Sequence, residues 1–358
     1  MYHSPRLLRL AAGAALCAAA ASGCTQLGPS SIANGRAAYT DVITRTNDEQ
    51  LLGSLVRLRY AETTSMLMVT AVTSSSEFSV DSSINLGFGQ HRGYEGNLVP
   101  FSAGGSYRES PTISYEPLSG AHFLKQLVTP ISLELYGLLV ESMSDSEWTL
   151  RLLTASMGGL DCPVSYESPR SADLARALAL MASLNRAGVM GFAYRTGDDD
   201  HVAGVDLVLD NTEAASHDIA ALLQLLGKPA PEKTGEHVRL ELQMGRIPSG
   251  PEALSLLTRS PMELMRLASQ GVQVPDEQLA AGIAPAAVMS SAAPFVKVHC
   301  GSTQPTDPFV SVEYRGYWFW VESNDIASKR GFSTMQTLLL SCLHEGSAAK
   351  PQLTLPVN

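Results

Sequence analysis

The amino-acid sequence predicts an α+β protein, and three observations support this class. Residues 64–116 alternate apolar and polar positions, as half-buried β-strands do. Leucine-rich segments on both sides of that stretch repeat at helical spacing. Residues 161–358 then alternate helices with strands that are joined by hairpin turns rather than by regular βαβ units. We therefore expect an N-terminal helix, a long amphipathic β-hairpin and a helical layer, followed by a mixed α/β C-terminal half with antiparallel hairpins.

Residues 1–23 have the three parts of a secretory signal. Two arginines form a positive head, residues 10–21 form an apolar core too short to span a bilayer, and small residues precede Cys24. The tetrapeptide that ends at Cys24 resembles the bacterial lipobox, although Ala21 stands where leucine is usual. We expect removal of residues 1–23 and acylation of Cys24. The alternative is an ordinary cleavage after Ala21, which would release a soluble periplasmic protein.

Acylation of Cys24 predicts where the protein works. Each buried methylene contributes about 0.8 kcal/mol, so two or three acyl chains hold a protein permanently at a membrane. Thr25 follows the cysteine, whereas aspartate at this place is typical of enterobacterial lipoproteins kept at the inner membrane. We therefore expect a lipid anchor in the outer membrane and a body that faces the periplasm. Residues 24–40 have linker composition and predict a flexible tether of roughly 20 Å.

Charge and length limit the partners. Removal of the signal takes away two of the 25 basic residues and none of the 35 acidic ones, which leaves a net charge of −12. Nucleic acid and anionic lipid surfaces are poor partners for such a protein. The expected partners are the membrane, reached through the lipid anchor, and envelope proteins or further copies of the chain. Double glycines near residue 158 predict a boundary between a domain at 41–160 and an α+β domain at 161–358.

The first predicted helix starts at Asn47, because Gln50 completes a capping box with it. Two arginines within this helix, Arg57 and Arg59, are expected to be solvated on its outer face. The apolar positions of the helix follow at helical spacing: Leu51, Leu52, Leu55 and Leu58.

The predicted β-hairpin has the clearest periodicity in the chain. One face of its first strand carries Phe78, Val80, Ile84, Leu86 and Phe88, and the intervening positions are polar. Two interpretations fit this pattern. The hairpin packs on a soluble core, or several copies each donate one hairpin to a shared transmembrane β-barrel.

The remaining elements follow in order along the chain. Three leucine-rich segments between residues 119 and 157 predict the helical layer. Ser260, Pro261 and Glu263 give a clear helix start. In the C-terminal half we expect helices at 169–185, 213–226, from about 251, from 261 and at 325–343, and strands at 189–195, 202–209, 237–244, 295–301, 309–314 and 317–321.

The sequence gives no catalytic residue, metal site or cofactor site above background. Residues 198–201 combine three aspartates with His201, but consecutive residues of a turn diverge, so a solvated turn is expected there. His299 and Cys300 are neighbours on a strand and face opposite sides, which excludes a base and nucleophile pair. Matches to serine β-lactamase signatures at 233–235 and 347–350 stand in the wrong order and are attributed to chance.

Two features of the C-terminal half remain as candidate sites. Trp318 and Trp320 fall on one face of a predicted strand, where they form a binding face for sugar rings or a partner protein, or pack a core. Cys300 and Cys342 lie in the same region and are the favoured disulfide of an oxidising periplasm. The alternative is that these two and Cys162 stay reduced and buried.

Four segments resemble a group of uncharacterised predicted lipoproteins of Gram-negative bacteria: RLRYAE (57–62), PTISYEPLSG (111–120), RGYWFWVESNDIASKR (315–330) and LTLPV in the tail. The resemblance implies an envelope location and transfers no activity. We therefore expect a non-catalytic binding or envelope-assembly component. The alternatives are an oligomeric outer-membrane pore or secretion component, and a periplasmic enzyme in which separated residues such as His122, His217 or Asp325 converge.

Overall fold

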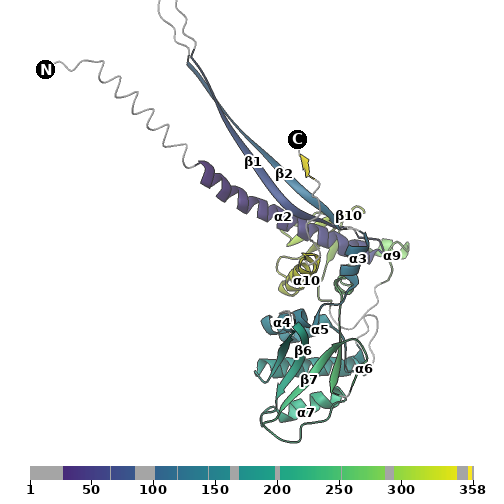
Figure 1. Ribbon diagram of the computed structural model, residues 1–358. Coiled ribbons are helices and arrows are strands. Elements are labelled where there is room, and N and C mark those ends of the chain that lie inside the picture. The colour runs from purple at the N-terminus through teal and green to yellow at the C-terminus, as the bar shows by residue number, and fades with distance from the viewer. Residues whose placement is uncertain are drawn as a thin grey trace, which may run out of the picture. The chain divides into compact units, whose positions relative to one another are not determined.

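The computed structural model of this chain describes residues 27–64, 66–84, 101–118, 120–143, 145–161, 169–197, 202–250, 252–286, 294–344 and 354–356 (Figure 1). In these ranges helices occur together with one six-stranded sheet and two three-stranded sheets, which confirms the α+β class. The predicted signal and Cys24 lie outside the described residues. None of the helices in the described ranges combines the length and hydropathy needed to cross a bilayer.

The chain divides into two compact units. The larger one, which we call the body, comprises Met1–Thr64 and Leu127–Leu340, and the smaller one comprises Ser65–Gln126 and Ser341–Asn358. This division differs from the expected boundary between residues 160 and 161. That boundary falls inside the six-stranded sheet, where Asp161 pairs with Ser156.

The body is built on the six-stranded sheet, with strand order β4-β3-β8-β7-β6-β5. Neighbouring strands are antiparallel except β7 and β8, which are parallel. The strands are β3 (Thr154–Met157), β4 (Leu160–Asp161), β5 (Met190–Thr196), β6 (Val202–Asp210), β7 (His237–Met244) and β8 (Ala253–Thr258).

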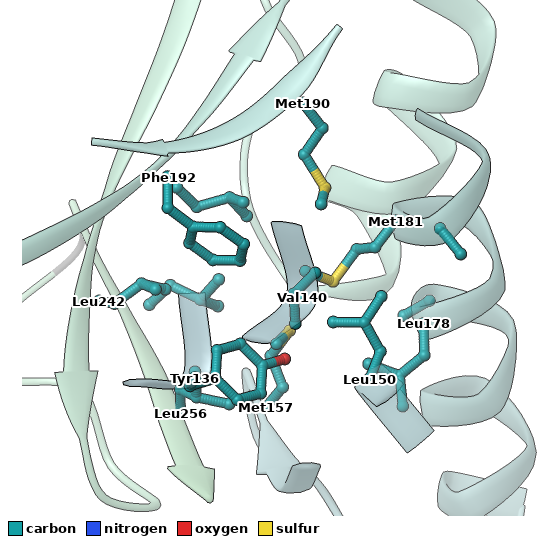
Figure 2. Packing of buried hydrophobic residues seen from close by; sticks show 14 of the residues in the cluster. Tyr136, Val140, Leu150, Met157, Leu178, Met181, Met190, Phe192, Leu242 and Leu256 are labelled. Carbon is teal, nitrogen blue, oxygen red and sulfur yellow. The ribbon is translucent and has the colours of Figure 1, made fainter. Parts of the chain in front are cut away.

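Helices cover one face of this sheet and form the main core with it. They are α4 (Leu133–Ser142), α5 (Ser146–Leu153), α6 (Pro169–Arg186) and α7 (Ser216–Leu225). Figure 2 shows Phe192 and Leu242 of the sheet facing Val140 and Met181 of the helices. The hydroxyl groups of the buried residues Tyr136 and Thr154 lie 2.9 Å apart, so these polar groups satisfy each other.

Two predictions in this region are wrong. Ala253–Thr258 is a strand and not part of a helix, because a continuous apolar run also suits a central strand that is buried on both faces. The last leucine-rich segment of the helical layer ends its helix at Leu153 and continues as β3. The capping box at Ser260 and Glu263 is confirmed, and it begins α8 (Pro261–Ser269).

The first helix, α2 (Leu27–Arg59), begins twenty residues before its predicted cap at Asn47. The expected flexible tether is therefore helical from Leu27, because a proline in the first turn costs no hydrogen bond and the packed C-terminal half propagates the helix. Its C-terminal half is buried against α8 and β10, whereas Val42 is 55 % exposed. From Leu27 to Leu51, the first buried leucine, the helix rises about 36 Å.

A three-stranded antiparallel sheet completes the body. Its order is β10-β11-β9, with β9 (His299–Gly301), β10 (Val310–Tyr314) and β11 (Tyr317–Val321). Beside it in sequence lie α9 (Asp276–Ala280) and α10 (Ile326–His344). The predicted strand at 317–321 is confirmed to the residue.

The smaller unit contains the predicted hairpin. Its strands are β1 (Met66–Ile84) and β2 (Phe101–Leu118), which are antiparallel, and the short β12 (Thr354–Pro356) pairs with β2 at residues 112–114. Helix α3 (Gly120–Val128) follows β2 in the chain. Both long strands, with 19 and 18 residues, exceed the usual strand length of about five or six.

Candidate functional site

The predicted pair Trp318 and Trp320 lies on the middle strand of the three-stranded sheet. Phe319 and Val321 alternate with them and are fully buried, whereas both indoles are half-buried. One face of β11 therefore packs the core, and the other is open enough for contact with a ligand. The sequence did not decide whether a core packs on both faces of this strand. The burial pattern shows that the face with Phe319 and Val321 is the packed one.

Strand pairing places four more residues on the open side. Residues directly opposite each other in an antiparallel pair share a face. Trp320 stands between Ser311 on β10 and His299 on β9. Trp318 stands between Glu313 and Gly301 in the same way. We call the six residues Trp318, Trp320, His299, Gly301, Ser311 and Glu313 the tryptophan face.

The indole of Trp320 is held by three neighbours. The His299 ring stacks on it with ring centroids 5.7 Å apart and an interplanar angle of 28°. Its Nε1 donates a hydrogen bond of 2.8 Å to Glu322 Oε1. Gly301 leaves room for the ring, because a Cβ at this residue would lie 3.2 Å from the indole. The ring is therefore fixed in place while it stays partly open to solvent.

The buried side of the same sheet is attached to α2 by an arginine–tyrosine cluster: Arg57, Tyr60, Glu62, Tyr314 and Arg315. The Tyr60 and Tyr314 rings meet edge to face at 5.3 Å, and Phe319 packs on both. The guanidinium of Arg315 lies over both tyrosine rings, at 5.7 and 5.6 Å.

An ion pair closes this cluster. Arg315 Nη2 donates to Glu62 Oε1 at 2.7 Å. Hydrogen bonding to Tyr314 and then to Arg315 lowers the pKa of the Glu62 carboxyl below its ordinary value of 4.5. The turn between β10 and β11 has positive φ at Arg315 and Gly316, 51° and 78°, as a type I′ turn requires. Arginine is an uncommon residue at such a φ, so the ion pair and ring contacts offset local backbone strain.

The environment of Arg59 differs from the expectation that both arginines of this helix are solvated. Arg57 is exposed as predicted, but Arg59 is only 4 % exposed and donates a hydrogen bond of 2.5 Å to the carbonyl of Pro285. Burial lowers its pKa, and its Nε has no partner among the described residues. Tyr60, the next residue, donates to Gln278 Oε1 at 2.5 Å, and burial raises the pKa of its phenol to about 12.

Cys300, one partner of the predicted disulfide with Cys342, has a free thiol in the structure. The side chain of Cys342 and all of Cys162 lie outside the described residues. Cys300 faces the buried side of β9, opposite Phe319, and burial raises the pKa of its thiol to about 11. A thiol with so high a pKa is a poor nucleophile at neutral pH.

The remaining candidates that the structure describes form no chemical centre together. Asp325 accepts hydrogen bonds from Ser328 N at 3.0 Å and Ser328 Oγ at 2.8 Å, and this bonding lowers the pKa of its carboxyl. It therefore caps α10. His217 lies in the first turn of α7, whereas the His122 side chain and residues 198–201 lie outside the described residues. Within the described ranges, no group of three or more histidine, cysteine, aspartate or glutamate side chains is placed to hold a metal ion.

No family model, curated protein sequence or solved structure matches this chain. The tryptophan face was predictable from the alternation along β11. The arginine–tyrosine cluster was not, because its members come from segments more than 250 residues apart in the chain, as the Arg315–Glu62 bond shows. The only sequence signal was that both segments are rich in arginine and tyrosine.

Proposed function

We propose that this chain is a lipid-anchored protein of the outer membrane that acts by self-assembly rather than by catalysis. The observation that carries the proposal is the β1–β2 hairpin, a two-stranded ribbon about 60 Å long by the usual rise per residue. Copies of the chain associate when these ribbons join edge to edge into one shared sheet.

The edges of the ribbon support this association. β1 is a terminal strand of its sheet, so its outer edge pairs with no strand in the described residues. Among the described residues, the outer side of β2 pairs only with β12, at residues 112–114. An isolated two-stranded hairpin is marginally stable in water, and a long free edge is a template for pairing with another chain. A second copy supplies the missing strands with the same sequence and length.

The strand register indicates that the two faces of the ribbon differ in polarity. Apolar positions oppose one another at Phe78 and Tyr107 and at Ile84 and Phe101. Polar positions oppose one another at Ser79 and Ser106, at Ser83 and Ser102 and at Glu77 and Arg108. Opposed residues share a face, so this part of the ribbon has one apolar and one polar face. A shared sheet of such ribbons suits the boundary between lipid and water, and each strand exceeds the ten or so residues needed to span a bilayer.

The sequence around Cys24 supports the location. A lipid anchor keeps every copy at the same membrane and so raises the local concentration of hairpins. The resemblance of residues 57–62 and 315–330 to predicted Gram-negative lipoproteins agrees with an envelope protein.

A matched pair of substitutions tests the proposal. Phe78→Arg places a charge on the apolar face, and Ser79→Arg places the same charge on the polar face one residue later. A charge on a lipid-facing strand costs about 2–4 kcal/mol at mid-membrane, so Phe78→Arg should abolish crosslinked oligomers in intact cells and Ser79→Arg should preserve them. Cys24→Ala should also lose them. Equal crosslinking of both arginine variants, or only single copies in the wild type, contradicts the proposal.

A further inference from the structure

The tryptophan face is a second site, and neither the lipid anchor nor the hairpin is needed to explain it. Its six residues form two rows across the sheet: Ser311, Trp320 and His299 in one, and Glu313, Trp318 and Gly301 in the other. Rows two residues apart along a strand are separated by about 6.7 Å. The face thus presents two large aromatic side chains in neighbouring rows of one sheet.

Partial exposure of these rings calls for an explanation. A tryptophan buries a large apolar area when it is packed, and an indole left half-open keeps part of that area in water. Here the Trp320 ring is nevertheless fixed by His299, Gly301 and Glu322, as the distances above show. Rigid, partly exposed aromatic side chains of this kind are typical of binding surfaces, because side chains that are already fixed lose little conformational entropy when a ligand binds.

The polar neighbours define the ligand chemistry. Glu313 is exposed beside Trp318, Ser311 is half-buried beside Trp320, and Glu322 holds the indole N–H. Carboxylate and hydroxyl oxygens accept hydrogen bonds, so they suit a ligand rich in hydroxyl or amide N–H donors. They also repel anions, as does the acidic chain as a whole.

A neutral sugar polymer meets both requirements. A pyranose whose substituents are all equatorial has flat faces of C–H groups, which pack on an indole, and hydroxyl groups at its rim, which donate to carboxylates. We infer that the tryptophan face binds neutral glycans built of gluco-configured pyranose units. A protein partner is the competing occupant, and a wild-type protein without saturable glycan binding in the experiment below would favour it.

The test uses the full mature protein in mild detergent and an N-acetylglucosamine oligosaccharide as the probe. Binding is followed by tryptophan fluorescence and by calorimetry, which does not depend on the fluorophores. The three tryptophans of the chain are Trp148, Trp318 and Trp320. Trp148 packs against the main core, so Trp148→Phe is the control that should leave affinity unchanged. Trp320→Ala and Trp318→Ala should each weaken binding roughly tenfold.

A second variant guards against loss of folding. Ser311→Arg keeps both indoles and adds bulk and positive charge to the same face, and it should also weaken binding while the thermal unfolding midpoint stays at the wild-type value. Three results overturn the inference: no saturable binding by the wild type, wild-type affinity in Ser311→Arg or in the tryptophan→Ala variants, or tighter binding of a sulfated glycan than of the neutral one. Oligomer formation is scored in parallel, so failure of this inference and failure of self-assembly are told apart.

Discussion

The six-stranded sheet and the β1–β2 ribbon are both made largely of antiparallel strands, yet they differ in how their faces and edges are satisfied. In the sheet, helices cover one face, and the edge strand β5 is protected because Phe192 N donates to the Glu141 carboxylate at 2.9 Å. In the ribbon, the outer edge of β1 has no partner strand within the described residues. This difference in how the edges are satisfied is the reason why we propose that copies of the chain assemble through the ribbon.

The largest expected effect concerns the core of the body. Leu254→Ala removes a fully buried side chain from a central strand and should lower the free energy of unfolding by about 3–4 kcal/mol. Val80→Ala in β1 should change the same quantity by less than about 0.5 kcal/mol. Urea unfolding followed by tryptophan fluorescence measures this, because all three tryptophans lie between Leu127 and Leu340. Equal effects of the two substitutions would show that the ribbon and the body unfold as one.

A substitution at the protected edge of β5 should have a smaller effect on the free energy of unfolding. Glu141→Ala removes the acceptor for Phe192 N and should cost about 1–2 kcal/mol, since a backbone donor loses its partner. It should also make the body aggregate, because a free strand edge recruits other chains. Light scattering during incubation at 37 °C measures this second effect. Glu134→Ala, on the same helix, is the control and should leave the scattering at the wild-type level.

The arginine–tyrosine cluster predicts a pH dependence of stability. The pKa of Glu62 is lowered in the folded protein, so its contribution is fully present well above pH 4.5 and is lost as the pH falls through the folded-state value. Glu62→Gln should therefore lower the thermal unfolding midpoint at pH 7. The difference from wild type should shrink steadily below pH 4.5. A difference that stays constant down to pH 3 would rule out an ionised Glu62 as its source.

The smallest effect is kinetic and concerns Cys300. Its pKa is raised to about 11 by burial, so iodoacetamide should modify it much more slowly in native protein at pH 8 than in urea. Mass spectrometry of the peptide that contains Cys300 measures the two rates separately from the other cysteines. Equal rates would indicate that the thiol is exposed, and a disulfide-linked peptide would restore the predicted bridge to Cys342.

The sequence predicted well those features that depend on neighbouring residues. The alternation along 317–321, the capping box at Ser260 and the hairpin all follow from local pattern, and each is present in the structure. Ala253–Thr258 was missed because burial on both faces removes alternation. The N-terminal part of α2, from Leu27, was predicted as a flexible tether. Its composition is that of a linker, and composition does not show that a helix packed at its C-terminal end extends toward the N-terminus.

Contacts between distant segments could not be predicted from the sequence, for a different reason. Arg59 was expected in solvent, but the backbone carbonyl that accepts its hydrogen bond belongs to Pro285. The tie between Glu62 and Arg315 likewise depends on how α2 packs on β10. A side chain's own sequence neighbourhood carries no information about such partners, so burial of a charged residue becomes visible only in the folded chain.

Native mass spectrometry of wild-type protein, extracted from membranes in mild detergent, measures whether other copies of the chain complete the ribbon. We expect one dominant species whose mass is an integer multiple of the acylated mature chain, and single chains for Phe78→Arg. A wild-type protein of single-copy mass, with the amides of residues 66–84 and 101–118 protected from hydrogen exchange in that single copy, would contradict it.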